Sequence, residues 1–144
     1  PYILAVGAEM RNYDILFDAV SSLDVEVVVK ASSAWMARAR GEFVSVPANV
    51  KLLTQHLSYE ELRNLYAGAA LVVTPLYETP QAAGITTILE GMAMGKCVIA
   101  TRSSGLPDIL VHGETEARNN LKLELKRIFP NVEPVETEKR YTLE

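Results

Sequence analysis

Residues 71–101 read LVVTPLYETPQAAGITTILEGMAMGKCVIAT. This segment predicts an apolar strand over residues 71–76, a polar loop, an amphipathic helix over about residues 85–94 and a buried strand over residues 97–101. A strand, a helix and a second apolar strand in this order indicate a βαβ unit, whose two strands run parallel. The stretch therefore places the chain in the α/β class.

The loop at residues 81–84 (QAAG) leads directly into the predicted helix. The first turn of a helix has backbone N–H groups without intrahelical partners, and the helix dipole places positive charge there. A helix that starts behind a small-residue loop at the carboxyl edge of a parallel strand is a typical phosphate site. We therefore expect the backbone of Gly84, Ile85, Thr86 and Thr87 to bind an anion, with a threonine hydroxyl as an additional donor.

Glu90 is an acidic residue within the apolar sequence of this helix, close to Ile88, Leu89 and Met92. Helical spacing puts it about one turn from the predicted anion site, within reach of the same ligand. A nucleotide would satisfy both features, with its phosphate at the backbone amides and its ribose hydroxyls at the carboxylate. The apolar neighbours argue against the alternative, a carboxylate that simply faces solvent.

Strand-like and helix-like segments alternate along most of the chain. Residues 2–6 are apolar, residues 25–29 and 50–53 are strand-like, and residues 13–23 show helical spacing. Ser58, followed three residues later by Glu61, predicts a capping box at the start of another helix. This alternation favours a doubly wound parallel sheet, in which ligands bind at the carboxyl ends of the strands.

The composition limits the possible functions. The 144 residues are 49% hydrophobic, carry a net charge of −4 and include one cysteine and two histidines. The negative charge and the absence of a basic run argue against nucleic-acid binding. One cysteine excludes an internal disulfide and a cysteine-based zinc cluster, and it indicates a reducing, cytoplasmic setting. No apolar run reaches transmembrane length. We expect neither a metal nor a cofactor.

Five motifs follow one another over residues 1–115. They are YILAVG at 2–7, VKLL with SYEEL and LYAGAA at 50–70, EGMAMGKCVI at 90–99, SGLPDIL at 104–110 and HGET at 112–115. In this order they resemble the C-terminal, donor-binding domain of GT-B glycosyltransferases, in particular glycosyltransferase family 4 (group 1). The third motif is similar to the family's helix signature Glu-Ala-Met-Ala-x-Gly-x-Pro-Val-Ile, with Cys97 at the position of the proline.

The resemblance implies a Rossmann-like, three-layer α/β/α single domain. It also implies transfer of a glycosyl group, such as a hexose, from a nucleotide diphosphate sugar to an acceptor hydroxyl, without a bound metal. The acceptor would belong to an N-terminal domain that this chain lacks, so we expect the chain alone to be inactive. Any membrane contact of the full-length enzyme would come from that missing part.

The family's acidic pair, Glu-x7-Glu, is only half present. Glu90 matches the second acid, which holds the ribose of the donor, but the position of the first acid is occupied by Ala82. Glu78 lies nearby but is displaced, and Gln81 offers hydrogen bonds without a charge. Both are candidates for contact with the donor sugar, although Glu78 fits an exposed loop charge equally well.

The resemblance assigns further residues to the donor site. The family places an Arg and a Lys after the first strand to neutralise the leaving diphosphate, and Arg11 and Lys30 are the candidates here. Ser104 and Gly105 resemble the loop that approaches the phosphates after the last strand. His56 lies where the loop that contacts the base passes.

After residue 115 the sequence departs from the family. Residues 121–129 look helical and residues 132–143 read as a β-hairpin. We therefore divide the chain into a donor-binding half at 1–115 and an atypical tail at 116–144. Either a loop of the family is omitted at this point, or foreign or rearranged sequence is joined there. Two alternatives follow: an engineered or chimeric Rossmann-like or flavodoxin-like protein without catalysis, and half of a sugar-nucleotide epimerase, which the shortage of acids and histidines disfavours.

Overall fold

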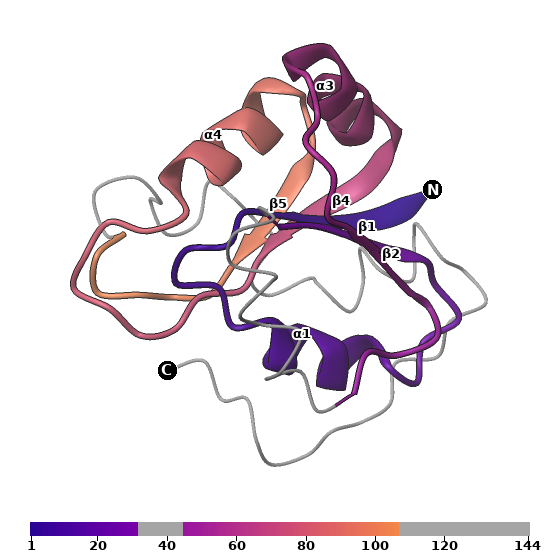
Figure 1. Cartoon of the computed structure of the whole chain (residues 1–144). Coiled ribbons are helices and arrows are strands. Elements are labelled where there is room, and N and C mark those ends of the chain that lie inside the picture. The colour runs from indigo at the N-terminus through magenta and orange to yellow at the C-terminus, as the bar shows by residue number, and fades with distance from the viewer. Residues whose placement is uncertain (32–44, 107–144) are drawn as a thin grey trace.

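A computed structural model describes residues 1–31 and 45–106 of the chain. Within these ranges five parallel strands form one sheet in the order β3-β2-β1-β4-β5. The strands are β1 (Tyr2–Val6), β2 (Val27–Lys30), β3 (Val50–Leu53), β4 (Ala69–Thr74) and β5 (Cys97–Ala100). Helix α1 (Tyr13–Val20) covers one face of the sheet, and α3 (Tyr59–Gly68) and α4 (Ile85–Ala93) cover the other (Figure 1). The expected three-layer, Rossmann-like architecture is confirmed.

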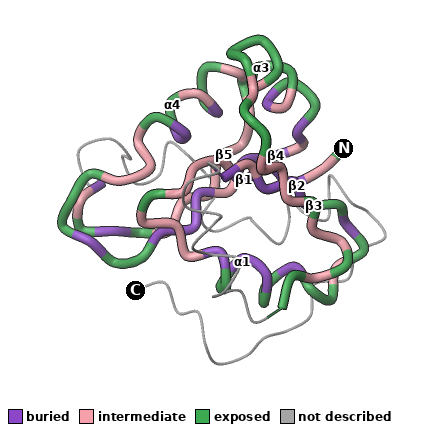
Figure 2. Tube along the Cα trace, viewed as in Figure 1, coloured by how far each residue is buried: buried purple, intermediate pink, exposed green. Residues whose placement is uncertain are grey.

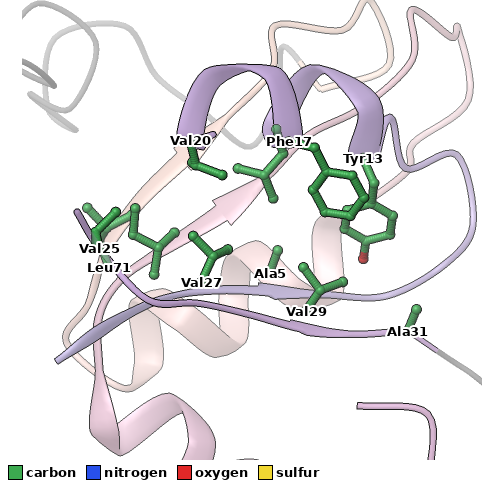
Figure 3. Packing of buried hydrophobic residues seen from close by; sticks show 11 residues of the cluster. Ala5, Tyr13, Phe17, Val20, Val25, Val27, Val29, Ala31 and Leu71 are labelled. Atoms are coloured by element: carbon green, nitrogen blue, oxygen red, sulfur yellow. The ribbon is translucent and has the colours of Figure 1, made fainter. Parts of the chain in front are cut away.

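The face of the sheet under α1 is the larger apolar core (Figure 3). Alternate strand residues point to it because successive side chains of a strand face opposite sides. The helix contributes side chains at a spacing of three and four, which form a single stripe. The buried residues of this core include Ile3, Ala5, Val27, Val29 and Leu71 from the sheet and Tyr13, Leu16, Phe17 and Val20 from α1. Each large apolar side chain buried in this way contributes about 1.5–3 kcal/mol.

The opposite face packs against α3 and α4. Leu4, Val28 and Val72 point to this side, and the ring of Tyr66 from α3 lies among them. Buried positions follow the inner strands and the inward sides of the helices, whereas the outer sides are exposed (Figure 2). A site on α4 therefore rests on two packed layers that hold its backbone in place.

The start of α3 agrees with the sequence prediction. The Ser58 side chain accepts a hydrogen bond from the backbone N–H of Glu61 at 3.2 Å, and the Glu61 carboxylate accepts one from the N–H of Ser58 at 2.7 Å. This reciprocal pair is the predicted capping box.

Helix α1 ends at Val20, three residues before the predicted end at Leu23. The cause is Asn49, whose side-chain amide donates hydrogen bonds to the carbonyls of Val20, Leu23 and Val25 at 2.9, 3.2 and 3.0 Å. These bonds satisfy the carbonyls in a turn leading to β2 and so replace the last helical turn.

Strand β4 occupies Ala69–Thr74, whereas the sequence predicts a strand at residues 71–76. It begins directly after α3 and ends before Pro75, which has no N–H to donate to a sheet. Beyond the proline, Leu76 forms an isolated antiparallel bridge with Arg11. The sheet therefore ends two residues early, and the chain turns toward the loop that follows β1.

Several predictions lie outside the described residues. They are the short helix at residues 35–40, the motifs at 107–115, the boundary at 115/116 and the helix and hairpin of the tail. Within the described ranges, none of the helices is long and apolar enough to span a lipid bilayer.

Gly91 provides a test of how tightly α4 lies on the sheet. A Cβ atom added there would lie 2.9 Å from Cγ2 of Val98 and 3.3 Å from Cγ2 of Val72. At an exposed helix position a Gly-to-Ala change stabilises by about 1 kcal/mol. Here we expect Gly91→Ala to destabilise by about 1–2 kcal/mol in chemical denaturation, because the new methyl group overpacks the interface. A gain in stability would contradict this close packing.

Candidate functional site

The candidate site lies at the point of the sheet where the chain stops adding strands on one side and starts adding them on the other. From β1 the chain proceeds to β2 and β3 on one side, and from β4 to β5 on the other, so β1 and β4 are adjacent. Doubly wound sheets bind ligands beyond the carboxyl ends of such a strand pair. The loops that follow β1 and β4 are joined by two backbone hydrogen bonds, Asn12 N to Pro75 O and Tyr77 N to Met10 O, each 3.0 Å.

Arg11 fills the junction between β1 and α4. Its Nε donates to the Val6 carbonyl at 3.1 Å, its Nη1 to the Glu9 carbonyl at 2.7 Å and its Nη2 to Oγ1 of Thr87 at 3.1 Å. Gly7 makes room for this side chain, since a Cβ at Gly7 would lie 2.5 Å from Nη2. Gly7 also has φ +102°, a conformation that disfavours other residues. The predicted cation is therefore held against the first turn of the predicted anion-binding helix.

The charge of Arg11 has no carboxylate partner in the described part of the chain, where the one ion pair joins Arg63 and Glu60 at 3.9 Å. Burial lowers the pKa of the Arg11 guanidinium from its ordinary value, partly offset by Tyr13, Tyr66 and Glu9. An arginine nevertheless keeps its proton at neutral pH, because its ordinary pKa lies far higher. A half-buried positive charge without a counterion favours the binding of an anion.

The first turn of α4 adds to this positive character. Its N-cap is Gly84, in the left-handed conformation at φ +78°, and no side chain among the described residues caps the helix. The turn contains no acidic residue. The N–H groups of Ile85, Thr86 and Thr87 therefore have no intrahelical acceptor, and the positive end of the helix dipole adjoins Arg11. The structure thus brings together Arg11 and the four residues predicted for the anion site.

Glu90 lies further along α4 and is half-buried. Its Oε2 accepts a hydrogen bond of 2.8 Å from the hydroxyl of Tyr66, a residue of α3 that is only 2% exposed. Burial, and next the contact with Glu90, raises the pKa of Tyr66 above its ordinary value, so the hydroxyl stays protonated. The Thr87 hydroxyl also interacts with that of Tyr66. Glu90, Tyr66, Thr87 and Arg11 thus form one polar series between the helices and β1.

The loops after β4 and β5 form a second group. Glu78 Oε1 accepts a hydrogen bond of 3.0 Å from the Ser104 N–H. The carbonyl of Thr79 accepts from the Ser103 hydroxyl at 2.6 Å and from the Gly105 N–H at 3.1 Å. These bonds bring Glu78 next to Ser104 and Gly105, two predicted residues that follow it by 26 or more positions in the sequence.

Gln81 belongs to the same group. Its side-chain Oε1 accepts from the Thr79 hydroxyl at 2.7 Å, and its carbonyl lies against Gly105. Gln81 is exposed, as is Glu78, so both predicted sugar contacts are accessible in the described structure.

Lys30 and His56 are placed differently. Lys30 ends β2, beside Val6 of β1, and its ammonium donates to the Ala31 carbonyl at 2.9 Å. His56 follows β3, which β2 and β1 separate from β4, and it is exposed. The structure places His56 before α3, next to the segment that starts at Ser58, and does not group it with Arg11 or Glu90.

Two residues that make hydrogen bonds in these groups, Tyr66 and Thr79, were not predicted from the sequence. Tyr66 stands in an apolar helix segment and looks like a core residue, although a buried tyrosine hydroxyl needs a partner. Thr79 looks like an ordinary loop residue next to Pro80. Among the described residues, no group of three or more His, Cys, Asp or Glu side chains is arranged to hold a metal ion.

The five-stranded parallel sheet with helices on both faces is a Rossmann-like fold of the GT-B class. A family model described as "Glycosyl transferases group 1" matches residues 1–124. The chain therefore belongs to the group 1 glycosyl transferases, and its fold is that of a GT-B domain.

One solved structure, that of WaaG, supports the fold, and a second is similar to the chain at a lower TM-score. WaaG, a glycosyltransferase involved in lipopolysaccharide biosynthesis, shares 24% sequence identity at a TM-score of 0.54, over 74% of this chain and 30% of WaaG. SnogD, a glycosyltransferase from Streptomyces nogalater, shares 22% identity at a TM-score of 0.41, over 69% of this chain and 26% of SnogD. The chain thus spans less than a third of either protein. None of the curated proteins matches it significantly.

Gly105 tests the contact between the two loops. A Cβ added at Gly105 would lie 2.1 Å from the backbone oxygen of Gln81, so the loops would have to separate. We expect Gly105→Ala to lower the free energy of unfolding by about 3 kcal/mol. Ser104→Ala, which removes only a hydroxyl that donates to Thr79 O, should cost about 1 kcal/mol. Equal losses in chemical denaturation would contradict a steric role for Gly105.

The stability that the contact between Glu78 and Ser104 contributes should depend on pH, because Glu78 can be protonated. Contact with the Ser104 side chain, and next the hydrogen bond from the Ser104 N–H, lower the pKa of the Glu78 carboxyl below its ordinary value. A lowered folded-state pKa adds stability above the unfolded pKa of about 4.3, and this stability is lost as the pH falls through the folded value. Glu78→Gln should therefore melt below the wild type at neutral pH, and the difference should vanish once the pH lies below the folded-state pKa of Glu78. A difference that persists in acid would mean that neutral contacts hold the loop.

Proposed function

We propose that this domain binds the nucleotide diphosphate sugar donor of a glycosyl transfer reaction. The observation that carries the proposal is the contact between Arg11 Nη2 and Thr87 Oγ1, 3.1 Å, at an uncapped helix start. A guanidinium without a carboxylate partner, next to helix N–H groups without intrahelical acceptors, favours a ligand with several negative oxygens. A diphosphate has this chemistry.

In this proposal the ribose hydroxyls bind Glu90. One carboxylate oxygen already accepts from Tyr66, and no hydrogen bond among the described residues ends on the other, Oε1. A carboxylate oxygen accepts hydrogen bonds from vicinal hydroxyls readily. Glu90 follows the first turn of α4, so phosphate and ribose would lie along one helix.

Arg11 and the α4 amides would then act on the leaving group. When the bond between the sugar and the diphosphate breaks, negative charge grows on the diphosphate oxygens. Positive groups already fixed in place stabilise that charge without reorganisation. Glu78 and Gln81, exposed in the loop after β4, are the proposed sugar contacts, and Lys30 would serve as a second cation if its ammonium turned from the Ala31 carbonyl.

The acceptor would bind elsewhere. The chain covers only 30% of WaaG, and the described residues form one sheet with its helices. We infer that a further, N-terminal domain supplies the acceptor hydroxyl and that the chain alone binds donor without transferring sugar. The cytoplasm is the proposed setting.

Calorimetric titration of the 144-residue chain with UDP, GDP and their sugar conjugates tests the donor site. We expect saturable binding of one nucleotide series, weakened by salt because the contact is electrostatic. Arg11→Gln should weaken binding by about 10–100-fold, the effect of losing a charged hydrogen-bond donor. Arg63→Gln is the matched control, because its side chain is 62% exposed on α3; it should change binding by less than about twofold.

Two results would contradict the proposal. One is the absence of binding by folded, monomeric wild-type chain with every nucleotide tested. The other is equal binding by wild type, Arg11→Gln and Glu90→Ala, which would place the nucleotide away from the start of α4.

A further inference from the structure

Tyr66 is a buried polar residue that the proposed donor site does not itself use. Its ring packs with Leu4, Val28 and Val72 in the core between the sheet and the two helices. Its hydroxyl reaches out of this core to Oε2 of Glu90 at 2.8 Å. A phenylalanine would fill the same space, so packing alone does not explain the hydroxyl.

The direction of this hydrogen bond is fixed by chemistry. An ionised carboxylate can only accept hydrogen bonds, so the Tyr66 hydroxyl is the donor. A glutamate side chain has several rotatable bonds and samples many rotamers when it is not held. Because Tyr66 holds Oε2, the carboxylate of Glu90 samples fewer orientations relative to α4.

We propose that Tyr66 is a positioning residue that aims the carboxylate of Glu90 at the ribose hydroxyls of the bound nucleotide. The inference rests on the proposed function, because it takes Glu90 as the ribose contact. Tyr66 also interacts with Thr87, the residue that accepts from Arg11. One buried hydroxyl thus connects the ribose end of the site to its phosphate end.

The preference for a nucleotide with ribose hydroxyls over one without them distinguishes a positioning role of Tyr66 from a general stabilising role. A nucleotide diphosphate and its 2′,3′-dideoxy analogue differ only in the hydroxyls proposed to contact Glu90. The ratio of their affinities reports that contact. A variant that merely loosens the domain weakens both ligands alike and leaves the ratio unchanged.

The experiment compares this ratio in four forms of the full chain by calorimetry. The ligands are UDP and 2′,3′-dideoxy-UDP, with the GDP pair titrated in parallel. We expect the wild type to prefer the ribonucleotide, Glu90→Ala to lose the preference and Tyr66→Phe to reduce it by about three- to tenfold. Tyr59→Phe, on the same helix but 92% exposed, should keep it.

The outcomes distinguish the two proposals. If Glu90→Ala abolishes the preference but Tyr66→Phe preserves it, the positioning role is overturned and the donor site stands. If the wild type binds nucleotide without any preference, or Glu90→Ala retains the preference, the ribose role of Glu90 fails and the role of Tyr66 fails with it.

Two further variants complete the test. In a chain already carrying Glu90→Ala, adding Tyr66→Phe should leave both affinities unchanged, since the hydroxyl then has no carboxylate to aim. A further loss in the double variant would contradict the proposal. Tyr66→Met replaces the phenylalanine variant if that protein does not fold, because methionine adapts to irregular core space without a hydroxyl.

Discussion

The candidate site depends on the hydrogen bonds that hold the Arg11 guanidinium in place. Its three nitrogens donate to Val6, Glu9 and Thr87 and so connect the end of β1, the following loop and the start of α4. Gly7, with no Cβ, makes this arrangement sterically possible. A Cβ at Gly7 would lie 2.5 Å from Nη2, so a larger residue there would force the guanidinium to move.

Much of the architecture could be predicted from the sequence, because it follows from local rules. Alternating apolar segments predicted the parallel sheet, and Ser58 with Glu61 predicted a helix start that the structure confirms. The end of α1 could not be predicted, because Asn49, from a distant turn, takes the carbonyls that a further helical turn would use. Strand β4 ends before Pro75, which has no N–H to donate to a sheet, but the apolar Leu76 made the predicted strand too long at this end.

The candidate site could be predicted only where it depends on local features of the sequence. The start of α4 is a local feature, and Arg11 follows the first strand at the edge where ligands bind. The partner of Glu90 was not predictable, since Tyr66 lies 24 residues earlier and has the appearance of a core residue. The contact of Glu78 with Ser104 spans 26 residues and uses a backbone N–H, which leaves no trace in the amino-acid pattern.

Groups that cost stability gather around the start of α4. Arg11 lacks a carboxylate partner and α4 lacks a side-chain cap within the described residues. Oγ1 of Thr74, buried beneath Gly84, has no hydrogen-bond partner there either. An unpaired buried hydroxyl costs about 1–3 kcal/mol, whereas the capping box of α3, on the same face of the sheet, is complete. Because local rules are typically broken where function requires it, this concentration supports a ligand site at α4 over an inert scaffold.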